Sequence, residues 1–212
     1  DLSIQATRVG SIAFTTAQIA VLETADIAVL STAALAALST AQIVALTTAQ
    51  VQQGLTTEQI SLGLSATQVA ALETRDVVVL STGQIAALGT EQEVALTTSQ
   101  VFALTTAQLA LGFSTAQVAA IETQDIAALS TANVAALTTA QVALGLRTAQ
   151  ITQGLSTSQI AALSTAQIKL GLTTAQVAAL TTAQIAVLST DQVNLGLRTD
   201  QVVALGTAQV AS

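Results

Sequence analysis

One octapeptide, read Ser/Thr-Thr-Ala-Gln-Ile/Val-Ala-Ala-Leu, follows itself through almost the whole chain. Thr15–Leu22 and Thr173–Leu180 are clear copies, and about 24 units can be aligned over residues 15–212. A short tandem period predicts an architecture in which each unit buries its apolar side chains against neighbouring units. We therefore expect residues 1–212 to form a single continuous repeat solenoid, with a divergent repeat or an N-terminal cap at residues 1–14 and a super-repeat of about 50 residues.

Each unit carries the start signal of a short helix. The Ser39 hydroxyl is placed to accept from the N–H of Gln42, and the Gln42 side chain is placed to accept from the N–H of Ser39, which is a capping box. Leu38 and Ile43 have the spacing of a hydrophobic staple. Because Ser/Thr-Thr favours a cap over a helix interior, a new helix should begin in every unit. The sequence thus predicts an all-α solenoid of about 24 very short capped helices, of about 6–8 residues, with two or three helices per turn.

A β-solenoid is the alternative architecture, since Thr, Ile and Val favour strands. The segment Gln-Ile-Ala-Ala-Leu argues against it, because its apolar residues do not alternate with polar ones. Some units have a ninth residue and end in Gly-Leu or Gly-Phe, as in Thr47–Leu55 and Arg147–Leu155. We expect the glycine of these units to take the left-handed conformation that often ends a helix.

A longer period lies within the short one. The motif Glu-Thr-x-Asp begins at Glu23, Glu73 and Glu122, which are 50 and 49 residues apart, or six units each. Six units form a whole number of turns whether a turn holds two helices or three. The motif has two interpretations: its carboxylates could be oxygen ligands for calcium, or its acids could replace Ser and Gln in the capping box, where the helix dipole favours them. We favour capping, and predict no metal site and no cofactor.

The composition excludes several kinds of function. The absence of Cys and His excludes the common zinc, iron–sulfur and haem sites and a Ser-His-Asp triad. Twelve acidic and five scattered basic residues give a net charge of −7, which argues against a nucleic-acid partner. No nucleophile–base pair or cofactor motif is present, so we expect no enzymatic activity and no catalytic residues.

The mean hydropathy of +0.68 invites a membrane interpretation. The apolar runs are only about four residues long, whereas a spanning helix needs roughly 18 or more consecutive apolar residues. We therefore predict no membrane insertion.

A few residues depart from the repeat. Phe14, Phe102 and Phe113 are expected to fill the core. Arg147 and Arg198 occupy cap positions and either lie solvated on the surface or contact a carboxylate on an adjacent turn. The Ser/Thr-Thr steps form ladders of hydroxyls, which we assign to helix capping in preference to a polar face for ice or polysaccharide.

The segments Leu163–Ile168 and Leu172–Leu180 resemble the short TAQIAAL-type tandem repeats of very large bacterial surface and type I secreted, adhesin-like proteins. The resemblance implies an extracellular or cell-surface location and supplies no catalytic residues. We expect a non-catalytic structural scaffold, such as a rigid spacer, an adhesin stalk or a filament-forming segment, with end-to-end or lateral self-association. The alternative is a repeat module that binds protein or glycan.

Overall fold

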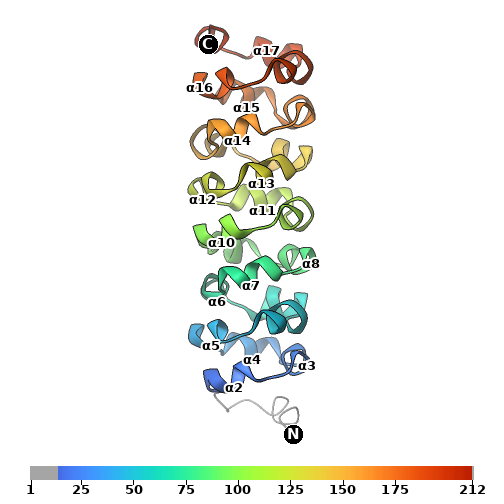
Figure 1. Cartoon of the computed structure of the whole chain (residues 1–212), viewed down its shortest axis with the longest axis vertical. Coiled ribbons are helices and arrows are strands. Elements are labelled where there is room, and N and C mark those ends of the chain that lie inside the picture. The colour runs from blue at the N-terminus through green and yellow to red at the C-terminus, as the bar shows by residue number, and fades with distance from the viewer. Residues whose placement is uncertain (1–13, 212) are drawn as a thin grey trace. The chain divides into compact units, whose positions relative to one another are not determined.

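The computed structural model describes residues 14–211 (Figure 1). Residues 14–103 form one compact unit, and residues 104–211 form a second. Within the described residues every element is a short helix and there is no strand, so the predicted all-α architecture is confirmed and the β-solenoid alternative is wrong. The predicted cap at residues 1–14 lies outside the described residues except for Phe14.

The helices are four to six residues long. Those of the first unit are α2 (Thr16–Ala20), α3 (Thr24–Ala28), α4 (Thr32–Ala36), α5 (Thr40–Val44), η1 (Gln50–Gly54), η2 (Gln59–Gly63), α6 (Ala66–Ala71), α7 (Thr74–Val79), α8 (Thr82–Ala86), α9 (Thr90–Val94) and α10 (Thr98–Ala103). Those of the second unit are η3 (Gln108–Gly112), α11 (Thr115–Ala120), α12 (Thr123–Ala128), α13 (Thr131–Ala136), η4 (Gln141–Gly145), η5 (Gln150–Gly154), α14 (Thr157–Ala161), η6 (Gln167–Gly171), α15 (Thr174–Ala179), α16 (Thr182–Ala186), η7 (Gln192–Gly196), α17 (Thr199–Val203) and α18 (Thr207–Val210).

The predicted capping box is confirmed at Ser39. The backbone N–H of Ser39 donates to Oε1 of Gln42 at 2.6 Å, and the backbone N–H of Gln42 donates to the Ser39 hydroxyl at 3.3 Å. The same reciprocal pair recurs in both units, as at Thr173 and Gln176. A helix of five residues is unstable alone in water, so these caps set where each helix begins while packing between helices stabilises it.

The nine-residue repeats each contain a π-helical turn, labelled η. In η1 the backbone N–H of Leu55 donates to the carbonyl of Gln50 at 2.9 Å, a bond that spans five residues. No described glycine has a positive φ, so the predicted left-handed glycine is wrong. Gly54 is needed for another reason: a Cβ there would lie 2.9 Å from Cβ of Ile27 and 3.1 Å from the carbonyl oxygen of Thr24, in the preceding turn. The glycine permits close approach of backbones.

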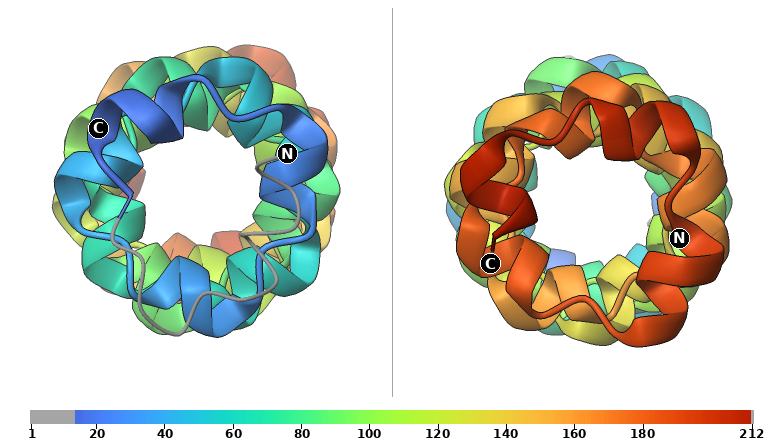
Figure 2. Two further views of the ribbon diagram at one scale, coloured as in Figure 1. Left: turned by 90° about the horizontal axis from the view of Figure 1, so that it is seen from below. Right: turned by 90° about the horizontal axis from the view of Figure 1, so that it is seen from above.

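Within each unit, a helix packs on the third helix before it. In the first unit α3 contacts η1, η1 contacts α7 and α7 contacts α10, and in the second unit η4 contacts η6 and η6 contacts η7. A turn therefore contains about three helices, the larger of the two predicted values. Seen end-on, the first turn of the first unit and the last turn of the second unit each wind around a ring (Figure 2). The super-repeat of six helices spans two turns. The helices of the first two Glu-Thr-x-Asp motifs, α3 and α7, therefore lie in the same stack with η1 between them.

The core comes from two positions of the repeat. The Ile or Val that follows the glutamine is fully buried in nearly every helix, as with Ile43. The Leu that ends each repeat is almost as well buried. Phe113 occupies that Leu position and is buried, as expected, while Phe14 is half-buried. Phe102 contradicts the prediction, since it replaces an outer Ala of α10 and is 64% exposed.

Candidate functional site

The recurring chemistry of each turn centres on the fourth residue of the octapeptide, which is nearly always glutamine. Gln50 is buried, and its Oε1 accepts from the backbone N–H of Thr47 at 2.7 Å. Its Nε2 donates to the carbonyls of Ile19 and Leu22 at 2.8 and 2.7 Å. One amide group thus caps its own helix and bonds the end of a helix in the preceding turn.

This double contact recurs along both units, and we call the set the glutamine ladder. Each bond to the carbonyl of the Leu, Ile or Phe at the end of an earlier repeat is 2.6–2.8 Å long from Gln50 to Gln201 and spans 28–30 residues. The residues of the ladder include Gln42, Gln50, Gln59, Gln68, Gln84, Gln92 and Gln100 in the first unit, and Gln141, Gln150, Gln159, Gln167, Gln176, Gln184, Gln192, Gln201 and Gln209 in the second.

Sequence reasoning assigned glutamine to the capping box alone and missed the ladder. Glutamate closes a capping box as well as glutamine does, but a carboxylate has no N–H to donate. The recurrence of glutamine at this position, where glutamate would cap equally well, was the signal for a second hydrogen bond.

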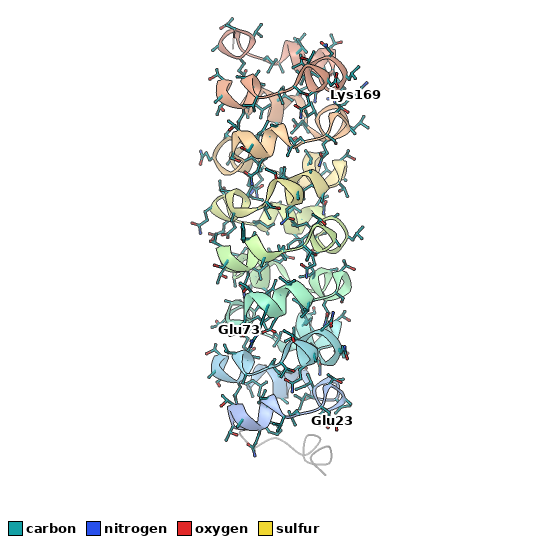
Figure 3. The ribbon with its side chains drawn as sticks, in the orientation of Figure 1. Glu23, Glu73 and Lys169 are labelled. Atoms are coloured by element: carbon teal, nitrogen blue, oxygen red, sulfur yellow. The ribbon has the colours of Figure 1, made fainter. Side chains whose placement is uncertain are left out.

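The two Glu-Thr-x-Asp motifs of the first unit make different contacts and lie on different turns. Asp26 accepts from the backbone N–H of Glu23 at 3.1 Å, as the capping interpretation predicts. Glu73 instead forms an ion pair with Arg75. Glu23 and Glu73 lie on different turns (Figure 3), and the described residues contain no group of three or more acidic side chains able to hold a metal ion.

The motif of the second unit uses its glutamate differently. Oε2 of Glu122 accepts from Nε2 of Gln124 at 2.9 Å, at the surface of α12. None of these motifs brings several carboxylates to one point, so a calcium cage has no geometric support within residues 14–211.

The two arginines at cap positions both contact the preceding turn. Arg147 donates to the carbonyl of Ile121 at 3.4 Å. Arg198 donates to the carbonyl of Lys169 and, at 3.0 and 3.1 Å, to the carboxylate of Asp200. The carboxylate that Arg198 contacts therefore lies on its own helix, and the hydrogen bond from Arg198 lowers the pKa of Asp200.

Among the exposed apolar side chains of the second unit, three leucines form a row on stacked helices, which we call the leucine row. Leu144, Leu170 and Leu195 occupy the same position in η4, η6 and η7 and are 75%, 67% and 62% exposed. Because these helices stack on one another, the row presents one leucine per turn. Lys169, next to Leu170, also lies at the surface (Figure 3).

The fold and the ladder define a repeat protein built from stacked turns of short helices. The ALTTAQ repeat family matches residues 19–53, 69–106, 118–153, 152–182 and 170–194, which together make up well over half of the chain. The chain belongs to the ALTTAQ repeat family. No curated protein and no solved structure matches the chain. Among the described residues, no helix is both long and apolar enough to cross a membrane.

Proposed function

We propose that the chain is a non-catalytic structural scaffold that serves as a rigid spacer or stalk segment of a bacterial extracellular or cell-surface protein. The observation that carries this proposal is the glutamine ladder. In each repeat the first Ser or Thr caps the helix, the Gln forms the ladder bond, and the Ile or Val and the Leu form the core. Little of the repeat is then left for chemistry. The location rests on the resemblance of Leu172–Leu180 to repeats of surface and secreted proteins.

A spacer must add length in proportion to its number of repeats. Inserting one further block of six repeats, copied from residues 73–121, adds two turns to the first unit. Because packed helices are about 8–10 Å apart, we expect the maximum dimension from small-angle X-ray scattering to increase by about 16–20 Å. A block of equal length with Gln→Glu at its ladder positions is the matched control, since it adds the same mass without the ladder. A maximum dimension that does not grow with the insertion would contradict the proposal.

The leucine row favours a second function, the binding of a protein. Leucines that recur once per turn give a partner several apolar contacts on one face, and such a face suits protein better than glycan. The partner with the simplest match is a second copy, whose own row presents the same spacing. Lateral association of this kind would bundle several stalks, and it is compatible with the spacer.

A further inference from the structure

The glutamine ladder of the first unit is interrupted at Asp76, which occupies the ladder position of α7. Its side chain is fully buried, and neither carboxylate oxygen has a hydrogen-bond partner among the described residues. The nearest cation is Arg75, whose Nε is 3.9 Å from Oδ1 of Asp76. Arg75 is itself mostly exposed, so this ion pair compensates the burial of Asp76 only weakly.

The carbonyl opposite this gap is that of Leu46. Gln68 donates to the carbonyl of Leu38, and Gln84 donates to that of Leu55. Leu46 ends the repeat between Leu38 and Leu55 and is buried. Among residues 14–211, however, its carbonyl accepts no hydrogen bond. A buried carbonyl without a donor destabilises the folded state.

Asn133 shows that a side chain of this length can close the gap. It occupies the same ladder position in α13, and its Nδ2 donates to the carbonyl of Leu104 at 2.9 Å. Aspartic acid has the length of asparagine, but it donates only when its carboxyl group is protonated. An ionised carboxylate at this position would face the Leu46 carbonyl with no hydrogen to offer.

The surroundings of Asp76 favour the protonated form. Burial raises the pKa of Asp76 above its ordinary value, and the charge of Glu73 adds to the rise, while Arg75 and the nearby backbone N–H of Glu73 oppose it. The helices that α7 contacts are η1 and α10, and neither of them contains an acidic or basic residue. Glu73 and Arg75, both in its own repeat, are thus the charged groups that act on Asp76.

We propose that Asp76 is a proton-dependent rung of the glutamine ladder, which donates to the Leu46 carbonyl as a neutral acid and releases this contact when it ionises. The folded state retains this proton to a higher pH than the unfolded chain does. The stabilisation is therefore complete below the ordinary pKa of aspartate and is lost as the pH rises through the raised folded value. The contact of α7 with the preceding turn is therefore weaker when Asp76 is ionised than when it is neutral.

The test compares Asp76→Asn with the matched variant Asp26→Asn, which changes the same motif in α3. The asparagine introduced in D76N would donate at every pH, so we expect the urea midpoint of D76N to exceed that of the wild type at about pH 7 and to equal it at about pH 3, below the titration of aspartate. D26N should not raise the midpoint at neutral pH, because Asp26 accepts from a cap N–H. Equal midpoints of D76N and wild type at both pH values would overturn the proposal.

A direct measurement keeps the proposal testable if either variant folds poorly. The carboxyl carbon of Asp76 can be titrated by carbon-13 NMR in the full-length wild-type chain. We expect its midpoint to lie above that of the exposed Asp200, whose pKa is lowered by Arg198, and above about 3.9, the ordinary value for aspartate. A midpoint at or below that ordinary value would overturn the proposal.

Discussion

At the scale of the single residue, the repeat depends on an amide side chain that both accepts and donates. In Gln159 the Oε1 accepts from the N–H of Ser156 at 2.7 Å, and the Nε2 donates to the carbonyls of Ile126 and Leu129 at 3.1 and 2.7 Å. The contacts of Nε2 are buried. If the amide were replaced by a group that cannot donate, each carbonyl would lose a hydrogen bond that water cannot replace. The same requirement explains why aspartate at position 76 creates a gap.

Replacing Gln159 with Glu separates the two functions of the side chain. The introduced glutamate would retain the capping acceptor but lose the donor, leaving a buried carboxylate opposite two carbonyls. We expect a loss of about 2–3 kcal/mol in the free energy of unfolding at neutral pH, measured by urea denaturation. The control is Gln153→Glu at an exposed site of η5, where a change within about 0.5 kcal/mol is expected. Equal effects of the two substitutions would show that the ladder bond contributes nothing.

At the scale of the element, local sequence signals determine where each helix begins, whereas contacts with the preceding turn determine which helices contain a π-helical turn. The capping box places the start of each helix, and it could be predicted because Ser39 and Gln42 are only three residues apart. The π-helical turn of η1 could not, because it depends on how closely Gly54 approaches Ile27 in the preceding turn. The ladder escaped prediction for the same reason, since its donors and acceptors lie 28–30 residues apart. Phe102 shows the limit of composition: an aromatic residue at an outer position of the repeat stays exposed.

The role of glycine in the π-helices predicts opposite effects for two Gly→Ala substitutions. In G54A the new Cβ would meet Cβ of Ile27 and the Thr24 carbonyl at 2.9 and 3.1 Å, and overpacking of this kind costs about 1–3 kcal/mol. In G83A the new Cβ would meet only the Ser81 hydroxyl at 3.9 Å, and Ala in place of Gly inside a helix stabilises by about 0.5–1 kcal/mol. Urea denaturation of both variants checks the signs. A stabilising G54A would disprove the close-approach argument.

At the scale of the whole molecule, stability is approximately a sum over contacts between successive turns. A repeat built in this way tolerates variation at its outer positions, because they contribute to no turn–turn contact. The π-helices show this directly: the outer position that is Leu144 in η4 is Gln53 in η1 and Gln153 in η5. Leucine at this position is thus not required for folding. It is also exposed in η2 and η3, as Leu62 and Leu111, but its recurrence on successive turns in the stack of η4, η6 and η7 calls for another explanation.

Lateral association through the leucine row is that explanation, and it can be tested by sedimentation velocity on the full chain. A stable dimer buries about 800 Å² per partner, and three leucines supply only part of this area, so we expect weak, concentration-dependent association. The triple variant L144Q/L170Q/L195Q introduces the residue found naturally in η1 and η5, so it should fold normally while association is lost. If wild type and variant associate equally, the contact lies elsewhere, as in end-to-end stacking. If both remain monomeric at every concentration, the row does not bind a second copy.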